Sequence, residues 1–268
     1  MDRFKERYGK WALIAGAAEG IGEGFSIQLA RVGMNIVMVD NNLEAMRRLA
    51  DRIIGEMQVE VRQIHLDLSF QEASGFVFQA TEDLDCRLLI YVSAYSKVKP
   101  FLSSSPAELD SYLMLNNRTP IHLVYGFAGR LQAKERSGGI ILISSLAGLL
   151  GPPLVAPYAA TKGFLIRLAE SLAAEFKPLS IDITVCCAGL TSTPTFLENT
   201  PEKTRNKVKP MDPEKVAEYA VRHLGRKAVC IPGWRNRMSF FLLLRLLPRA
   251  LSLKIMGKTM KKMYLVVR

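Results

Sequence analysis

The sequence predicts an α/β fold, in which one doubly wound parallel sheet of about seven strands is flanked by helices. Apolar runs of strand length alternate with helix-length segments along most of the chain. These runs are continuous in Val, Ile and Leu, which is typical of strands that are buried on both faces. Repeated strand–helix units with right-handed crossovers then place the strands in one parallel sheet.

The expected elements alternate strictly, beginning with a strand. The strands are expected at residues 11–15, 35–39, 59–65, 88–92, 139–144, 181–187 and 228–231. The helices are expected at residues 21–32, 43–55, 71–84, 106–135, 158–177 and 212–224. No linker or longer repeat interrupts this order. We therefore expect a single domain over residues 1–233, followed by a basic, hydrophobic extension over residues 234–268.

The net charge of +11 is concentrated at one end of a chain that is otherwise ordinary, with 49% hydrophobic and 23% charged residues. Residues 225–268 contain eleven of the 36 Lys and Arg residues and no Asp or Glu. The first 224 residues therefore balance 25 basic against 25 acidic side chains. This distribution argues against nucleic acid binding by the main domain and directs attention to the C-terminus.

The four cysteines show no metal-ligand spacing and the three histidines lie far apart in the sequence, so no metal site is expected. Cys186 and Cys187 fall inside an apolar run, where buried thiols are the simplest interpretation. The N-terminus is too charged for a signal peptide. These features favour a cytoplasmic protein in a reducing compartment.

A glycine cluster, from Gly16 through Gly20 and Ile21 to Gly22, follows the first expected strand. Glycines at a strand-to-helix turn allow tight turns and a close approach of the backbone to a pyrophosphate, whose charge favours a helix N-terminus. Glycines that only let the helix pack on the strand are the alternative. Asp40 favours the Rossmann-type dinucleotide site, because an acid at the end of the second strand can accept hydrogen bonds from the adenosine ribose.

The same Asp40 predicts NAD as the cofactor, with NADP less favoured. A 2′-phosphate would meet this carboxylate as a like charge, and Glu19 adds a second acid nearby. Asp67, after the third strand, could contact the adenine amino group. A helix-capping role for Asp67 or Ser69 is an equal alternative.

Tyr158 and Lys162 lie one helical turn apart on the same face, and Tyr158 follows Ser145, the end of an apolar run, by thirteen residues. A free tyrosine titrates near pH ~10, so work at neutral pH needs a shift of roughly 3 units, or ~4 kcal/mol. A partly buried ammonium close by supplies energy of that order. We expect Tyr158 to exchange a proton with an alcohol or carbonyl, Ser145 to orient the reacting oxygen, and Lys162 to lower the tyrosine pKa and bind ribose.

With these motifs the chain resembles the short-chain dehydrogenase/reductase family over about residues 8–232. The resemblance implies an NAD-binding catalytic domain over residues 1–233. It implies that Asn116, rather than the neighbouring Asn117, kinks a helix and holds a water that relays protons to the lysine. It also implies that Gly189 and Thr193, after the sixth strand, meet the nicotinamide carboxamide.

Two departures from the family pattern are present. The usual Asn-Asn-Ala-Gly after the fourth strand reads Val92 to Tyr95, and the usual proline before Gly189 is Ala188. Tyr95 lacks the conformational freedom of glycine, so the backbone beside the ribose is expected to differ. The first departure motivates a competing hypothesis, a catalytically silent nucleotide-binding regulator. The bulky residue in place of glycine also resembles a bacterial branch of the family that includes bile-acid hydroxysteroid dehydrogenases.

Residues 146–157 contain no charge and should border the substrate, while residues 191–209 should form a lid over it. An apolar wall favours a small lipophilic alcohol or ketone, such as a steroid, bile acid or acyl chain. Packing of residues 146–157 on another subunit is the alternative. The resemblance implies a homodimer or homotetramer through the helices near residues 106–135 and 158–177.

The extension over residues 234–268 has three competing interpretations. Its longest apolar run is too short to span a bilayer, and Pro248 should break any helix there. It could be a peripheral anchor at the inner face of a membrane, a flap over the active site or a subunit interface, and the sequence favours the first. A membrane-associated scaffold is accordingly a further functional hypothesis.

Overall fold

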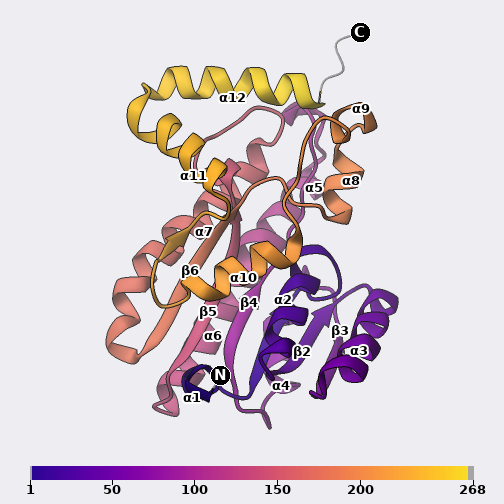
Figure 1. The fold of residues 1–268 in the computed structure, drawn as a ribbon, viewed down its shortest axis with the longest axis vertical. Helices are drawn as coiled ribbons and strands as arrows, with labels where there is room; N and C mark the ends of the chain where they lie inside the picture. Colours follow the sequence, from indigo (N-terminus) through magenta and orange to yellow (C-terminus); the bar gives the residue numbers. More distant parts are fainter. Residues whose placement is uncertain (1, 265–268) are drawn as a thin grey trace.

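A computed structural model describes residues 2–264 and contains one sheet of seven parallel strands (Figure 1). The strands are β1 (Trp11–Ala15), β2 (Asn35–Asp40), β3 (Val61–His65), β4 (Cys86–Tyr91), β5 (Gly138–Ser145), β6 (Ile181–Ala188) and β7 (Val229–Cys230). Their order across the sheet is β3-β2-β1-β4-β5-β6-β7. The predicted doubly wound sheet is confirmed, and the chain reverses its direction of winding between β1 and β4.

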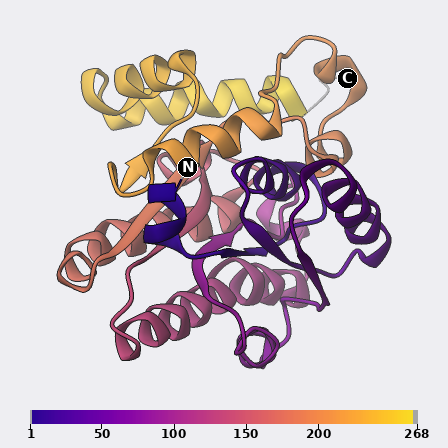
Figure 2. The ribbon, with the colours of Figure 1, turned by 60° about the horizontal axis from the view of Figure 1, so that its bottom comes forward.

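Helices cover both faces of the sheet (Figure 2). The α-helices are α1 (Asp2–Tyr8), α2 (Gly20–Arg31), α3 (Leu43–Met57), α4 (Ala73–Gln79), α5 (Pro106–Leu113), α6 (Thr119–Ala133), α7 (Ala156–Glu175), α8 (Pro194–Asn199), α9 (Glu202–Arg205), α10 (Pro213–His223), α11 (Trp234–Phe241) and α12 (Arg249–Tyr264). Short 3₁₀ turns are η1 (Phe101–Ser103), η3 (Leu146–Gly148) and η4 (Lys177–Leu179), and π-helical turns are η2 (Met114–Arg118) and η5 (Leu242–Leu246). None of the helices within residues 2–264 is long and apolar enough to cross a membrane.

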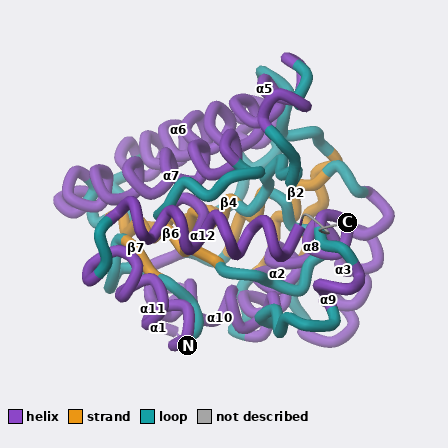
Figure 3. The backbone as a smooth tube through the Cα atoms, turned by 90° about the horizontal axis from the view of Figure 1, so that it is seen from above, coloured by secondary structure: helices purple, strands orange, loops and turns teal. Residues whose placement is uncertain are grey.

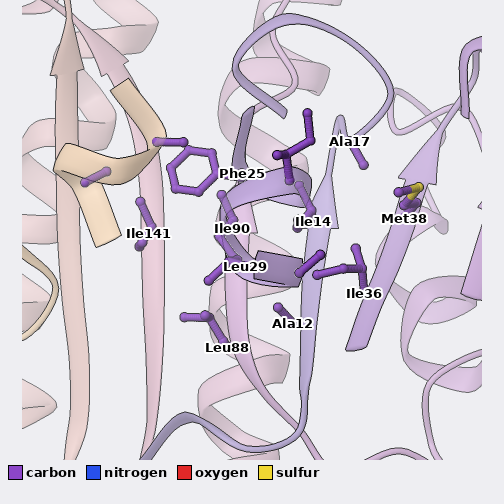
Figure 4. Close-up of a cluster of buried hydrophobic side chains, with 14 of the residues drawn as sticks. Ala12, Ile14, Ala17, Phe25, Leu29, Ile36, Met38, Leu88, Ile90 and Ile141 are labelled. Atoms are coloured by element: carbon purple, nitrogen blue, oxygen red, sulfur yellow. The ribbon is translucent and has the colours of Figure 1, made fainter. Parts of the chain in front are cut away.

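The core consists of two apolar layers, one on each face of the sheet. On one face, Phe25 and Leu29 of α2 lie among Ile14, Ile90 and Ile141 of the strands, as Figure 4 shows. The other face packs against α4, α6 and α7. Successive residues of β1 enter opposite layers and all are buried, which explains why the strand sequences are continuously apolar.

Several element boundaries differ from the sequence prediction. The helix expected at 71–84 covers only Ala73–Gln79, because residues 80–85 form turns that return the chain to β4. The helix expected at 106–135 is divided into α5 and α6 by the π turn η2, at the kink that the family resemblance implied for Asn116. Helix α1 was not predicted, nor were the short helices α8 and α9 within the segment expected to form a lid.

The expected break at Pro248 is present, since this residue lies between η5 and α12. Parallel strands bring their carboxyl ends to one edge, so the residues that follow β1, β2, β4, β5 and β6 meet there. This carboxyl-end edge lies at the top of Figure 1, beneath α12.

Candidate active site

The glycine cluster forms a close-packed turn between β1 and α2. Gly16 has φ +85° and Gly20 has φ +58°, a region that side chains with a Cβ rarely adopt. A Cβ on Gly16 would lie 2.5 Å from Ser93 Oγ, and a Cβ on Gly22 would lie 1.7 Å from the Gly16 carbonyl oxygen. The backbone conformation and the packing therefore both require glycine here.

The N-terminus of α2 has the properties of an anion site. Its N-cap residue, Glu19, makes no side-chain capping hydrogen bond, so the first amides of the helix are open to a ligand. Ile21 sits in this first turn and packs partly on the core. Open amides at the N-terminus of a twelve-residue helix, next to a turn without side chains, fit the pyrophosphate of a dinucleotide.

Asp40 ends β2 and faces this turn. Its Oδ2 accepts a hydrogen bond from Ala18 N at 2.9 Å, and its Oδ1 accepts one from Asn42 N at 3.0 Å. These contacts fix the carboxylate beside the glycine turn while each oxygen keeps a free lone pair. Arg47 and Arg48, on the following helix α3, are exposed.

The Asp67 carboxylate stabilises the turn after β3 and does not cap a helix. Its Oδ1 accepts a hydrogen bond from Ser69 N at 2.8 Å. The next helix begins only at Ala73, with Glu72 at its N-cap, so neither Asp67 nor Ser69 caps it. The capping alternative was wrong because a turn separates β3 from α4, and the adenine contact stays a prediction.

Ser145, Tyr158 and Lys162 converge at the carboxyl end of β5. Ser145 is the last residue of β5, and its Oγ accepts a hydrogen bond from Ala147 N at 3.2 Å. Tyr158 and Lys162 lie in the first two turns of α7, and Lys162 Nζ is 5.6 Å from the centre of the Tyr158 ring. The predicted neighbours are thus brought together.

Burial dominates the titration of this pair. Desolvation raises the pKa of Tyr158 to about 12, although the nearby Ser145 hydroxyl acts in the opposite direction. Desolvation also lowers the pKa of Lys162 to about 7. Lys162 Nζ donates to the Ile143 carbonyl oxygen at 2.7 Å and only 2% of this residue is exposed. Burial therefore keeps Tyr158 protonated near neutral pH.

Asn116 lies in the π turn η2, where the predicted interruption of the helix is found. Its Oδ1 accepts from Tyr95 N at 2.7 Å, and its Nδ2 donates to Tyr95 O and to Thr161 Oγ1, each at 3.0 Å. The π turn thus directs a buried amide that holds the segment after β4 against α7. Its role in a proton relay stays a prediction.

Tyr95 occupies the position where the family pattern has glycine. The four non-glycine residues with positive φ within residues 2–264 do not include Tyr95. Its side chain packs edge-on against Tyr112, and its hydroxyl donates to Glu108 Oε1 at 3.2 Å. The backbone at this position therefore does not need the freedom of glycine.

Gly189 and Thr193 follow β6 at the same edge of the sheet. A Cβ on Gly189 would lie 2.7 Å from Asn236 Nδ2, so this glycine permits close packing of the C-terminal segment. The Thr193 hydroxyl accepts from Phe196 N at 3.2 Å and caps α8. A Cβ on Gly20 would lie 2.8 Å from Thr193 Cγ2, so the glycine turn and the start of the lid adjoin. The carboxamide contacts predicted for Gly189 and Thr193 stay predictions.

The C-terminal segment closes the site from above. Helix α12 crosses the carboxyl-end edge toward α8 and α9 (Figure 3). Met263 O accepts from Thr204 Oγ1 of the lid at 2.7 Å, and a Cβ on Gly257 would lie 3.7 Å from Pro153 of the apolar loop. Tyr264 is near enough to Tyr158 to raise its pKa. The three interpretations of the tail stay predictions.

Sequence reasoning missed several residues that build the site: Tyr95 as a partner of Asn116, Thr161, Asn236 and Tyr264. Asn116 offered one usable signal, since a buried amide needs hydrogen-bond partners, which here come from the segment after β4 and from α7. The positions of Asn236 and Tyr264 depend on how the tail folds back, which no spacing rule in the sequence determines. An apolar hollow of about 290 Å³ lies beside the site, between residues 147–152, α7 and Arg249.

Comparison with known proteins identifies relatives along most of the chain. The family model of the short chain dehydrogenases matches residues 10–204. A 7beta-hydroxysteroid dehydrogenase from Clostridium sardiniense is 33% identical over 234 residues, which cover 87% of this chain and 89% of that protein.

Solved structures agree. A 7beta-hydroxysteroid dehydrogenase structure superposes with a TM-score of 0.86 at 29% identity, covering 94% of this chain and 98% of that chain. The bulky-bulky ketone specific alcohol dehydrogenase from Comamonas testosteroni gives a TM-score of 0.75 at 28% identity, with 88% of this chain and 92% of that chain covered.

Proposed function

Because the chain belongs to the short-chain dehydrogenase family, we propose that it is a nicotinamide-dependent oxidoreductase that interconverts a secondary alcohol and a ketone. The observation that carries this proposal is the convergence of Ser145, Tyr158 and Lys162 at the carboxyl-end edge of the sheet, the same edge that carries the glycine turn. A proton donor, an orienting hydroxyl and a buried amine are the groups that this reaction needs from a protein.

Tyr158 acts as the acid and base of the reaction. Its Oη takes the hydroxyl proton of the alcohol during oxidation and returns it to the carbonyl oxygen during reduction. Ser145 Oγ donates to the same oxygen, while the Ala147 amide holds the serine in place. Tyr158 therefore transfers the proton, and Ser145 orients the reacting oxygen.

Lys162 supports the phenolate form by its charge. Its Nζ lies 5.6 Å from the centre of the Tyr158 ring, and a positive charge at such a range favours the charged form of the tyrosine. When bound at Gly16, Gly20, Ile21, Gly22 and Asp40, an oxidised nicotinamide dinucleotide supplies the hydride acceptor and a further positive charge.

We favour NAD over NADP because Asp40 is fixed beside the glycine turn by two backbone amides. A 2′-phosphate placed there meets a carboxylate, and Asn41 and Asn42 offer it no cation. Because Asp40 carries this preference for NAD, a single substitution of Asp40 tests it.

The substrate class we propose is a lipophilic, hydroxysteroid-like alcohol or ketone. The loop of residues 146–157 carries no charge, and α12 covers it with Gly257 close to Pro153. Proteins similar to this chain carry names that specify hydroxysteroids and bulky ketones. A large apolar substrate suits an uncharged wall beneath a helical roof.

The test is a turnover screen over steroid, bile-acid and acyl alcohols and ketones, followed by the absorbance of reduced nicotinamide, with Tyr158→Phe beside the parent. We expect kcat to fall by about 10²–10⁴-fold in this variant, with an unchanged cofactor Kd by calorimetry. Tyr125→Phe, an exposed tyrosine on α6, is the matched control. Turnover retained in Tyr158→Phe contradicts the assigned role.

The competing hypothesis of a catalytically silent regulator rested on the segment from Val92 to Tyr95. Asn116 holds the Tyr95 backbone, and the backbone there is unstrained. Stoichiometric cofactor binding without turnover of any compound in the screen is the outcome that would favour this hypothesis.

A further inference from the structure

The C-terminal layer, which we define as residues 234–264, has an outer face that no other described part of the protein covers. On α11, Trp234, Met238 and Phe241 follow the i, i+4, i+7 pattern of one helix face, and each is more than half exposed. On α12, Leu251 and Ile255 are also exposed, one turn apart. The inner side of α12 packs against Pro153 of the apolar loop and against Thr204. Its outer side is exposed.

The same layer carries a uniform positive charge. It contains eight basic residues, all exposed: Arg235, Arg237, Arg245, Arg249, Lys254, Lys258, Lys261 and Lys262. Across residues 2–264, no salt bridge involves any of them. Residues 225–268 include no acid that could compensate them locally. A partner of this face therefore has to be anionic.

The positive charge and the exposed apolar side chains together decide which kind of partner can bind the C-terminal layer. A second copy of this chain, related by a twofold axis, would set the same basic layer against itself and repel. A nucleic acid duplex would match the charge, but its phosphate surface would leave the side chains of Trp234, Met238 and Phe241 without a partner. An anionic bilayer surface matches both features, because its headgroups attract Lys and Arg while its interface accepts apolar and aromatic side chains.

We propose that the C-terminal layer binds the surface of an anionic lipid membrane. Trp234, Met238 and Phe241 enter the interface between headgroups and acyl chains, and the lysines of α12 lie over the phosphates. The protein stays on one side of the bilayer, since no described helix can cross it. The inner side of α12 then faces the active site while its outer side faces lipid.

The experiment is flotation of the full-length protein with vesicles of phosphatidylcholine alone or of equal parts phosphatidylcholine and phosphatidylserine. We expect binding to the phosphatidylserine vesicles only, declining as salt is raised because the attraction is screened. Replacing the four α12 lysines with serine (Lys254, Lys258, Lys261 and Lys262) should weaken this binding at least tenfold. Trp234→Ser with Phe241→Ser should weaken it as well.

The matched control replaces four exposed lysines that precede strands at the opposite edge of the sheet: Lys10, Lys134, Lys177 and Lys227. It removes the same charge, so retained binding in this control locates the effect in the C-terminal layer. Equal loss in both lysine variants overturns the proposal, as does failure to bind phosphatidylserine vesicles at low salt. Self-association that Phe241→Ser abolishes, without vesicle binding, assigns the face to a second copy and also overturns it.

Discussion

The ammonium group of Lys162 lies in the protein interior with the Ile143 carbonyl oxygen as its hydrogen-bond partner and no salt-bridge partner within residues 2–264. Burial lowers its pKa from 10.5 to about 7. Between these values the unfolded chain binds the proton more strongly than the folded protein. The contribution of Lys162 to folding stability therefore improves as pH rises from about 7 to 10.5 and is least favourable below about 7.

Lys162→Met tests this linkage in the cofactor-free protein. We expect its free energy of unfolding to exceed that of the parent by about 1–3 kcal/mol near pH 7, because a buried charge is replaced by an apolar chain. The advantage should shrink near pH 10, where Lys162 is neutral in the folded protein and the penalty of burying its charge is small. Urea denaturation measures the difference, and Lys134→Met on the surface is the control. A difference that is independent of pH contradicts the shifted pKa.

Asp40 carries the proposed choice between the two nicotinamide dinucleotides. Asp40→Asn removes the charge and keeps one oxygen acceptor for the Ala18 or Asn42 amide. We expect the ratio of kcat/KM for NAD over NADP to fall at least about tenfold, since the like-charge contact with a 2′-phosphate is removed. Steady-state kinetics with both cofactors measures this ratio. Glu44→Gln, an exposed acid of α3, is the control, and a ratio unchanged in Asp40→Asn contradicts the assignment.

At the residue scale, spacing alone brought Ser145, Tyr158 and Lys162 together, because a strand end and one helix turn fix their positions. The sequence also placed the glycine turn and Asp40 at adjacent strand ends. It did not predict the protonation of Lys162, which depends on the amount of protein packed around its ammonium group. Reference pKa values describe solvated groups, so this part required the structure.

At the element scale, the strands were predicted closely, whereas the connections after β6 were not. Helices α8 and α9 are too short to show a periodic apolar pattern, and residues 191–209 were predicted only as a lid. Pro248 correctly marked the end of one helix. The direction in which α12 then runs is set by contacts with Pro153 and Thr204, far away in the sequence.

Gly257, in the middle of α12, offers a test of how firmly this helix covers the site. A Cβ there meets nothing closer than Pro153 at 3.7 Å, so Gly257→Ala fits without strain. Alanine favours a helix over glycine by about 1 kcal/mol, so opening of α12 should become up to about fivefold rarer. Trypsin cleavage within the helix, followed by mass spectrometry, should slow in proportion.

The matched variant is Gly55→Ala in α3, whose added Cβ also meets nothing within 4 Å. It should stabilise its own helix without changing cleavage in α12. Equal slowing in the two variants would show that α12 opens only with global unfolding.

At the scale of the whole molecule, the distribution of charge along the chain is enough to distinguish a neutral body from a basic C-terminal layer. The fold adds that this layer lies over the carboxyl-end edge, where the candidate active site is (Figure 1). Residues 1–233 and 234–264 are therefore in contact, and Gly189 packs directly against Asn236. The division at residue 233 stays a prediction about sequence organisation.

A different surface suits self-association. Helices α6 and α7 cover the same face of the sheet, and their outer sides expose apolar residues, with Tyr125 81% exposed and Ile121 and Phe164 more than a third exposed. Unlike the C-terminal layer, this surface is not dominated by one charge, so two copies can meet across a twofold axis without strong repulsion. We predict a homodimer through α6 and α7.

Tyr125→Glu should weaken this dimer at least about 30-fold, the effect of losing an aromatic anchor worth about 2 kcal/mol, because it also sets two carboxylates near each other. Sedimentation velocity over a concentration series measures the dissociation constant. Phe241→Glu in the C-terminal layer is the control and should leave the dimer intact. The reverse pattern, with loss of association only in Phe241→Glu, would place the subunit interface on the C-terminal layer and contradict both this interface and the assignment of that layer to lipid.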